Sequence, residues 1–187
     1  LHPRWVANED GTLLPLLGGV SRADGSPELW ILEAIEPHGE QADPFTLSPI
    51  EAQYPAETDP KQRLTDPFET ILARQVFGRG EPPRWAILVS ADQLLLLDRS
   101  KWHEKRLLRF DLREILDRRE TTTLQATAAL LHRESTCPGE GTPLLDTLDE
   151  NSHKHAFAVS EDLKYSLREA IELLGNEAVR HLREVSK

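Results

Sequence analysis

The stretch RWAILVSADQLLLLDRSKW, residues 84–102, decides the fold. Its WAILV segment is a continuous apolar run, which is typical of a strand buried on both faces of a sheet. The following SAD is a turn signal, and QLLLLD predicts a returning strand, so the stretch as a whole predicts a β-hairpin. RLLRF at residues 106–110 predicts a third strand, and DLREIL begins a short helix after it. We therefore expect a sheet that contains these three strands.

The chain before this hairpin predicts more strands and then a long loop. PRWVA and TLLPLL are short apolar runs separated by the turn signal NEDG, and ELWILEAI follows the turn ADGSP. Three strands or two hairpins fit residues 1–36. Residues 37–66 are rich in proline and have little periodicity, which favours a loop or flap.

Helices are expected on both sides of the hairpin. TDPFETILARQVFG, residues 65–78, predicts a helix with Asp66 as N-cap, Pro67 at the first position, Glu69 completing a capping box and Gly78 at the end. Residues 121–134 are also helical in pattern. Residues 135–159 are expected to form a loop with short turns. A last helix is expected from Ser160, with an apolar stripe of period ~3.6.

These patterns predict an α/β (α+β) fold, a mixed sheet with flanking helices and a helical C-terminal segment. The expected division is residues 1–118, including the loop or flap at 37–66, and a helical segment at 119–187. The chain contains no methionine, even at position 1, so we expect it to be a fragment.

Composition limits the function classes. The chain has 187 residues with 22 basic and 32 acidic side chains, a net charge of −10, so nucleic-acid binding over the whole surface is excluded. The single Cys137 lies in a predicted loop without a partnered histidine, which favours an incidental thiol. We find neither a signal peptide nor ~18 consecutive apolar residues, so we expect a cytoplasmic protein without a membrane partner.

Two longer stretches resemble a known family. They are WAILVSADQLLLLDRSKWHEKRLLRFDLREIL and PLLDTLDENSHKHAFAVSEDLKYSLREAIELLGNEAV. DRSKW, LRFDL and LDENSHKHAF carry most of the resemblance, which covers most of residues 67–184. It is to the N-terminal region of bacterial adenine-specific DNA methyltransferases of the type IIG restriction–modification and phage-defence kind.

The resemblance implies a restriction-endonuclease-like domain that precedes a methyltransferase domain of the same chain. The parent protein would use S-adenosylmethionine. The present sequence has no glycine-rich loop for that cofactor and no Asn-Pro-Pro-Tyr or Asp-Pro-Pro-Tyr run to hold a flipped adenine, so this chain alone is not expected to methylate DNA.

The stretch DGSPELWILEAI raises the question of a nuclease site. In nuclease-like folds, two carboxylates hold Mg²⁺ and a nearby lysine orients the attacking water. Asp24 and Glu33 are the candidate metal ligands and catalytic carboxylates, but Ile35 stands where the lysine belongs. Alternatively, Asp24 serves a turn and Glu33 is a solvated strand end. An active Mg²⁺-dependent endonuclease and a degenerate nuclease-like domain both stay open.

Residues 98–119 are the most basic window, with eight basic and five acidic residues (8 − 5 = +3). The candidate DNA-backbone contacts in this window are Arg99, Lys101, Lys105, Arg106 and Arg109. The alternative is a solvated strand edge, where such residues prevent aggregation. His153 and His155 could share a metal, but more simply belong to a polar loop.

The sequence thus predicts the N-terminal module of a DNA restriction–modification or phage-defence methylase that contacts or positions DNA. The expected partners are DNA and the methyltransferase domain of the same chain. An active endonuclease and a non-catalytic structural or protein-interaction domain are the alternatives. No cofactor is expected in this fragment other than Mg²⁺ in the nuclease case.

Overall fold

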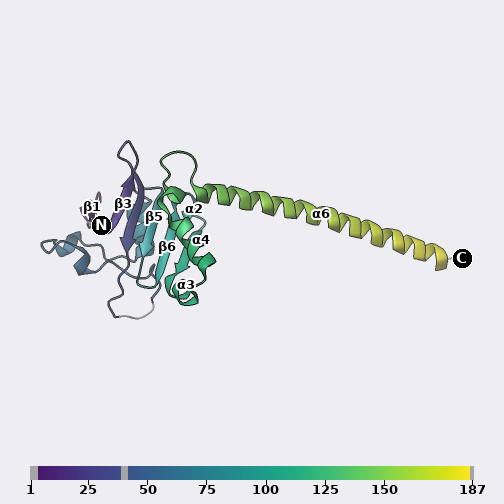
Figure 1. Ribbon diagram of the computed structural model, residues 1–187, viewed down its shortest axis with the longest axis horizontal. Coiled ribbons are helices and arrows are strands. Elements are labelled where there is room, and N and C mark those ends of the chain that lie inside the picture. Colours follow the sequence, from purple (N-terminus) through teal and green to yellow (C-terminus); the bar gives the residue numbers. More distant parts are fainter. Residues whose placement is uncertain (1–3, 39–41, 186–187) are drawn as a thin grey trace. The chain divides into compact units, whose positions relative to one another are not determined.

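A computed structural model describes residues 4–38 and 42–185, with the backbone alone for residue 158 and residues 173–185. The chain divides into two compact units, Leu1–Cys137 and Pro138–Lys187. The first unit holds the β-sheet and the second holds one long helix (Figure 1). The expected boundary at residue 118, between a nuclease-like domain and a helical segment leading towards a methyltransferase domain, stays a prediction.

A five-stranded mixed sheet forms the centre of the first unit. Its spatial order is β3-β4-β5-β6-β7, and only β4 and β5 run parallel. The strands are Gly18–Ser21, Pro27–Glu33, Trp85–Val89, Gln93–Asp98 and Leu107–Asp111. The predicted hairpin of residues 84–102 and the third strand after it are therefore confirmed, and so is the mixed α/β class.

A separate two-stranded hairpin precedes the sheet. β1, Arg4–Ala7, pairs antiparallel with β2, Leu13–Leu16. With β3 and β4 paired in the same manner, residues 1–36 form two hairpins, one of the two arrangements that the sequence allowed.

The helix predicted at residues 65–78 is present but begins differently. α1, Phe68–Ile71, runs into a π-helical turn, η3, Leu72–Val76. The prediction of Asp66 as the N-cap is wrong. Pro67 occupies that position, and no side chain caps the helix. The first two free amides, of Phe68 and Glu69, donate instead to the carbonyls of Leu47 and Phe45, at 2.8 and 3.1 Å. Backbone from the long connection thus replaces the expected cap.

The hydrophobic core lies between α1–η3 and one face of the sheet. Alternate residues of the strands point to that face. The central members of this cluster are Trp30, Leu32, Phe68, Ile71, Leu72, Val76, Ala86, Leu88, Leu95 and Leu97. The intervening residues Leu29, Trp85, Leu96 and Phe110 are also buried, so both faces of the sheet are covered.

The described part of the connection between β4 and β5 is packed rather than a free flap. It contains two short 3₁₀ turns, η1, Glu51–Gln53, and η2, Pro60–Gln62. Tyr54 is buried, and its hydroxyl accepts the Leu64 amide at 3.0 Å. The Gln53 side chain donates to the Glu33 carbonyl at 2.9 Å. The prediction of little regular structure is confirmed, but this connection is a closely fitted crossover.

The remaining helices follow the sheet in sequence. They are α2, Arg99–Trp102; α3, Leu112–Arg118; α4, Thr121–Leu131; α5, Arg133–Thr136; and α6, Leu144–Val185. The loop predicted at 135–159 is wrong from Leu144 onward, because α6 is one continuous helix of 42 residues. Pairs four residues apart, such as Glu150 with Lys154 at 2.8 Å, support helix where isolated polar residues suggested a loop.

Within the part of the chain that the structure describes, no helix is both long enough and apolar enough to cross a membrane.

Candidate nucleic-acid interface

The predicted DNA-contacting cations gather on one structural feature, the α2–β7 arm, which we define as residues 99–109. β7 pairs only with β6 within the five-stranded sheet, so the last part of the arm lies along a sheet edge. Asp98 begins α2 by accepting the Ser100 amide at 2.8 Å. Lys105 takes a left-handed backbone conformation with φ 54° and turns the chain into β7.

Trp102 attaches the arm to the core. Its ring lies 6.1 Å from the ring of Phe45 and 5.7 Å from that of Phe77, measured between centroids. Both contacts are edge-on or tilted, the geometry that aromatic pairs prefer. The arm is therefore held from beneath by an aromatic cluster while its charged side chains remain at the surface.

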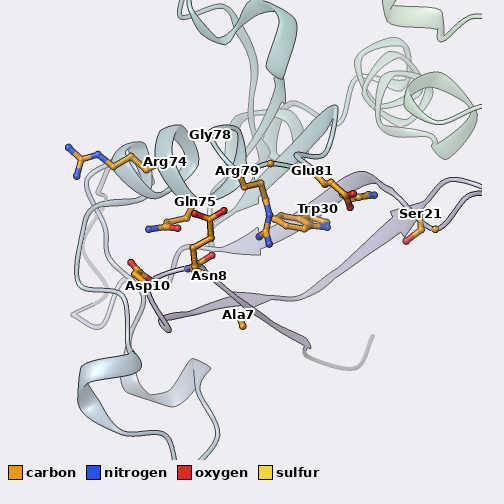
Figure 2. Close-up of a pocket in the computed structure, with 14 residues that line it drawn as sticks. Ala7, Asn8, Asp10, Ser21, Trp30, Arg74, Gln75, Gly78, Arg79 and Glu81 are labelled. Carbon is orange, nitrogen blue, oxygen red and sulfur yellow. The ribbon is translucent and has the colours of Figure 1, made fainter.

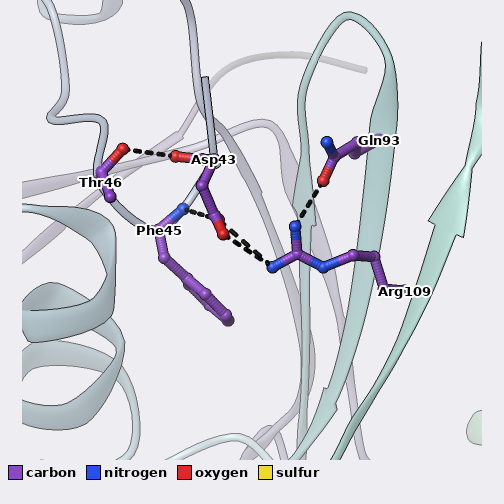
Figure 3. A network of polar contacts seen from close by, with 5 residues as sticks. All are labelled: Asp43, Phe45, Thr46, Gln93 and Arg109. Atoms are coloured by element: carbon purple, nitrogen blue, oxygen red, sulfur yellow. Dashed lines mark hydrogen bonds and ion pairs between the residues drawn. The ribbon is translucent and has the colours of Figure 1, made fainter. Parts of the chain in front are cut away.

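Arg109 is the most constrained of the five cations (Figure 3). Its Nη1 donates to Gln93 Oε1 at 2.7 Å, and its Nη2 donates to Asp43 Oδ2 at 3.1 Å. The guanidinium also lies over the Phe45 ring at 5.8 Å. Asp43 is in turn fixed because its carboxylate accepts the Phe45 amide at 3.0 Å. Arg109 therefore joins the sheet edge to the long connection, a structural role that the sequence did not reveal.

The other cations are held more loosely. Lys105 Nζ lies 2.9 Å from Glu69 Oε1, and the exposed fractions of these side chains are 79% and 51%. Arg106 lies 3.3 Å from Glu104, and both side chains are about half exposed. Arg99 is exposed and Lys101 is partly buried. Exposed ion pairs such as these contribute only about 0–1 kcal/mol, so a phosphate group can replace the carboxylate at little cost.

The two carboxylates predicted for a nuclease site lie apart. Asp24 is in the turn before β4, where its carboxylate accepts the Ser26 hydroxyl at 2.6 Å and the Ser26 amide at 2.9 Å. Those bonds lower the pKa of Asp24. Glu33 is the last residue of β4, so the length of a seven-residue strand, about 20 Å, separates the two positions. The structure does not bring them together, and they cannot share one Mg²⁺ within this chain.

Metal and nucleophile chemistry have little support elsewhere. Among the described residues, no group of three His, Cys, Asp or Glu side chains is arranged to hold a metal ion. His153 lies on α6 and faces Asp149 at 3.6 Å. Cys137 is buried, and burial raises the pKa of its thiol, which keeps it protonated at neutral pH.

A pocket lies on another part of the first unit (Figure 2). Its volume is about 660 Å³, and its lining includes the turn between β1 and β2, residues 7–10, and the segment after η3, residues 78–81. Trp30 is at its floor, with the Arg79 guanidinium 4.8 Å above the ring. One lining carboxylate, Asp10, has its pKa lowered by hydrogen bonds from Thr12.

The chemistry of this pocket does not favour one ligand class. Its lining carries Arg74 and Arg79 together with Glu9, Asp10 and Glu81, so it offers no field of a single sign. Arg79 Nη1 has no hydrogen-bond partner among the described residues, but this atom is shielded from solvent. A ligand could reach it only after the guanidinium left Trp30.

The sequence did not predict that Arg109 is positioned by Asp43, Phe45 and Gln93. Asp43 and Arg109 are 66 residues apart, and no local motif links them. Gln93 was visible only as the first residue of a predicted strand. The one available signal was Asp43-Pro44, a turn pair in the proline-rich region.

Comparisons with protein-family models, with curated proteins and with solved structures gave no match to this chain. The resemblance to DNA methyltransferases and the nuclease-like fold therefore stay proposals.

Proposed function

We propose that this chain is a non-catalytic, DNA-contacting module of an adenine-specific restriction–modification or phage-defence methylase, with a degenerate restriction-endonuclease-like fold. S-adenosylmethionine would be bound by a methyltransferase domain of the parent protein, and the present chain would hold the duplex in position. The observation that carries the proposal is the α2–β7 arm, where five cations lie within eleven residues that lead into the edge strand β7.

Two features favour backbone contact over base reading. The arm presents lysine and arginine side chains in exposed ion pairs, which phosphates can displace. Its aromatic residue, Trp102, packs against Phe45 and Phe77 and is therefore not available to stack on a base. Contacts of this kind fix the position of a protein on DNA without reading sequence.

Degeneracy of the nuclease site is the second part of the proposal. Asp24 and Glu33 lie at opposite ends of β4, and Ile35 occupies the position where an active site needs lysine. An aliphatic side chain neither orients water nor offsets charge on a phosphate. The placement of these residues supports a positioning role over Mg²⁺-dependent cleavage.

Salt-dependent binding to a fluorescent DNA duplex tests the DNA-contact role. Each phosphate contact contributes about 0.9 to the slope of log affinity against log salt concentration, so three contacts weaken binding roughly 40-fold between 50 and 200 mM salt. The variant Arg99→Gln, Lys105→Gln, Arg106→Gln should lose this dependence.

The matched control removes three cations from α6 instead, as Lys154→Gln, Lys164→Gln, Arg168→Gln. Each of those cations is in an exposed ion pair, as Lys105 and Arg106 are, and both variants lose three positive charges. Equal weakening by both variants would show that net charge alone acts. Absence of binding at 50 mM salt would remove the DNA-contact role.

A protein-interaction domain is the second candidate function. The observation that favours it is the exposed apolar surface of α6, where Val159, Leu163 and Leu167 are each more than half exposed. Scattered apolar residues are common on surfaces, but a line of them along one helix indicates a partner.

A further inference from the structure

We propose that α6 associates with α6 of a second copy of this chain as an antiparallel two-helix pair. This inference concerns the second unit alone and goes beyond the proposed DNA contact. It begins from the exposure of α6. None of the described side chains of this helix is buried, although Leu148, Val159, Leu163 and Leu167 are 45%, 57%, 64% and 63% exposed.

The apolar residues follow a regular spacing along α6. From Leu145 they recur in steps of three, four and four residues, which is a repeat of eleven. We call these positions the α6 stripe: Leu145, Leu148, Ser152, Ala156, Val159, Leu163, Leu167 and Ala170. The sequence continues the same steps at positions 174 and 178, which hold Leu and Ala.

This spacing keeps the stripe on one side of the helix. Eleven residues in three turns give about 3.67 residues per turn, close to the 3.6 of a straight α-helix. A heptad repeat would need a left-handed supercoil to keep its seam in contact, whereas this stripe needs little supercoiling. Two copies of α6 can therefore lie against each other along most of their length.

The size of the stripe is sufficient for a specific dimer. A helix of 42 residues is about 63 Å long, and a helix with its side chains is about 10–12 Å wide. One face therefore covers on the order of 600–750 Å² for each chain. Stable interfaces bury about 800 Å² for each partner, so two such helices come close to a standard interface without other contacts.

Charge favours the antiparallel orientation. Residues 144–162 carry Lys154 and five carboxylates, a net charge of 1 − 5 = −4, and residues 163–185 carry four cations and four carboxylates, 4 − 4 = 0. A parallel pair would place −4 beside −4. An antiparallel pair places −4 beside a neutral half and avoids that repulsion.

Side-chain size fits the same orientation. When two stripes run antiparallel about a centre near residue 165, Ala156 of one copy lies opposite Leu174 of the other, and Val159 lies opposite Ala170. Alternating small and large residues across a seam allow the helices to pack closely. The resulting interface is self-complementary, as two-fold symmetry requires.

The molar mass of the full chain in solution tests the association. Light scattering after size exclusion at 10–100 μM should give a dimer, twice the 21.2 kDa of one chain. Leu163→Glu with Leu167→Glu places charges in the stripe and should give a monomer. The matched control is Tyr165→Glu, which changes a side chain of similar exposure, 67%, on another side of the helix and should stay dimeric.

A second variant keeps the test independent of helix loss. Ser152 is the single polar residue of the described stripe, so Ser152→Leu should tighten the dimer by at least tenfold in Kd, because two leucines become buried. A monomeric unmodified chain at 100 μM, or a dimer that is unaffected by both stripe variants, would overturn the inference and leave the stripe to a different partner.

Disulfide capture distinguishes the orientations. A mixture of Ala156→Cys and Leu174→Cys chains should cross-link as heterodimers, whereas Ala156→Cys alone should not. The unmodified chain, with Cys137 only, provides the background. Rapid cross-linking of Ala156→Cys with itself would show a parallel pair and contradict the proposed orientation.

Discussion

At the scale of single residues, Tyr54 shows how a long connection is held to the sheet unit. Its ring is buried beside the core, and its hydroxyl is the acceptor for the Leu64 amide, 10 residues further along the chain. Burial raises the pKa of this phenol above its usual value of 10. One side chain therefore closes the loop between η1 and η2 through both its ring and its oxygen.

Replacing this tyrosine gives a prediction with a pH dependence. Tyr54→Phe leaves the Leu64 amide without its acceptor and should lower the free energy of unfolding by about 1–2 kcal/mol at pH 8. The folded chain keeps the phenol protonated above pH 10, whereas the unfolded chain ionises it there. The unmodified protein therefore loses stability as the pH rises from about 10 through the higher folded pKa.

Urea unfolding followed by tryptophan fluorescence at pH 8 and pH 10.5 measures both effects. The difference between the unmodified protein and Tyr54→Phe should become smaller at the higher pH, since phenylalanine does not titrate. A difference that grows with pH would show that the hydroxyl is not buried in its neutral form.

The sequence predicted which charged side chains lie close along the chain, but not which residues distant in sequence they contact. It grouped Lys101, Lys105 and Arg106 into one basic segment, because they are close along the chain. The spacing of Asp24 and Glu33 suggested a shared metal site, although a seven-residue strand keeps them apart. The hydrogen bond from Arg109 to Asp43 could not be predicted, because it depends on how the whole connection between β4 and β5 folds.

At the scale of elements, the chain leaves η3 at a point where the backbone of Gly78 lies close to the backbone of the helix. The helix changes from α to π geometry at Leu72, and Gly78 follows where the chain leaves it. A Cβ atom on Gly78 would lie 2.8 Å from the Ala73 carbonyl oxygen and 2.9 Å from that of Arg74. Backbone carbonyls cannot move aside as a flexible side chain can, so only glycine fits.

Two glycines close to each other in sequence give a matched comparison. Gly78→Ala should lower the free energy of unfolding by about 1–3 kcal/mol, because the new methyl group forces the η3 backbone to shift. Gly80→Ala meets nothing within 4 Å and should be neutral or stabilising by up to about 1 kcal/mol. Urea denaturation of both variants checks this, and equal stabilities would argue against the close packing at Gly78.

The elements also show where local patterns are sufficient. Continuous apolar runs predicted β5 and β6, because strands buried on both faces leave no alternation. The start of α1 was misplaced at Asp66, since its amides find carbonyls from residues 45 and 47, more than 20 residues away. The first half of α6 was taken as a loop because its stabilising pairs are side-chain contacts one turn apart.

At the scale of the whole molecule, unfolding of the two units can be followed by different spectroscopic signals. All four tryptophans, Trp5, Trp30, Trp85 and Trp102, belong to Leu1–Cys137, whereas α6 supplies 42 helical residues and no tryptophan. Fluorescence therefore follows the sheet unit, and far-ultraviolet circular dichroism is dominated by α6.

This division predicts two unfolding transitions with different concentration dependence. If α6 is stabilised by a second copy, dilution from 50 to 1 μM should lower the urea midpoint measured by circular dichroism. The fluorescence midpoint should not move, because the core of the sheet unit lies within one chain. Coincident transitions that are both independent of concentration would contradict the proposed pairing and couple the units into one cooperative block.

The position of Cys137 has a practical consequence. This residue is the last of the first unit, immediately after α5, and its buried thiol can react only when the part of that unit around it opens. The rate at which a thiol-specific alkylating reagent modifies Cys137 would therefore report how often this part of the first unit opens. This measurement uses the cysteine of the unmodified chain and needs neither a label nor an engineered residue.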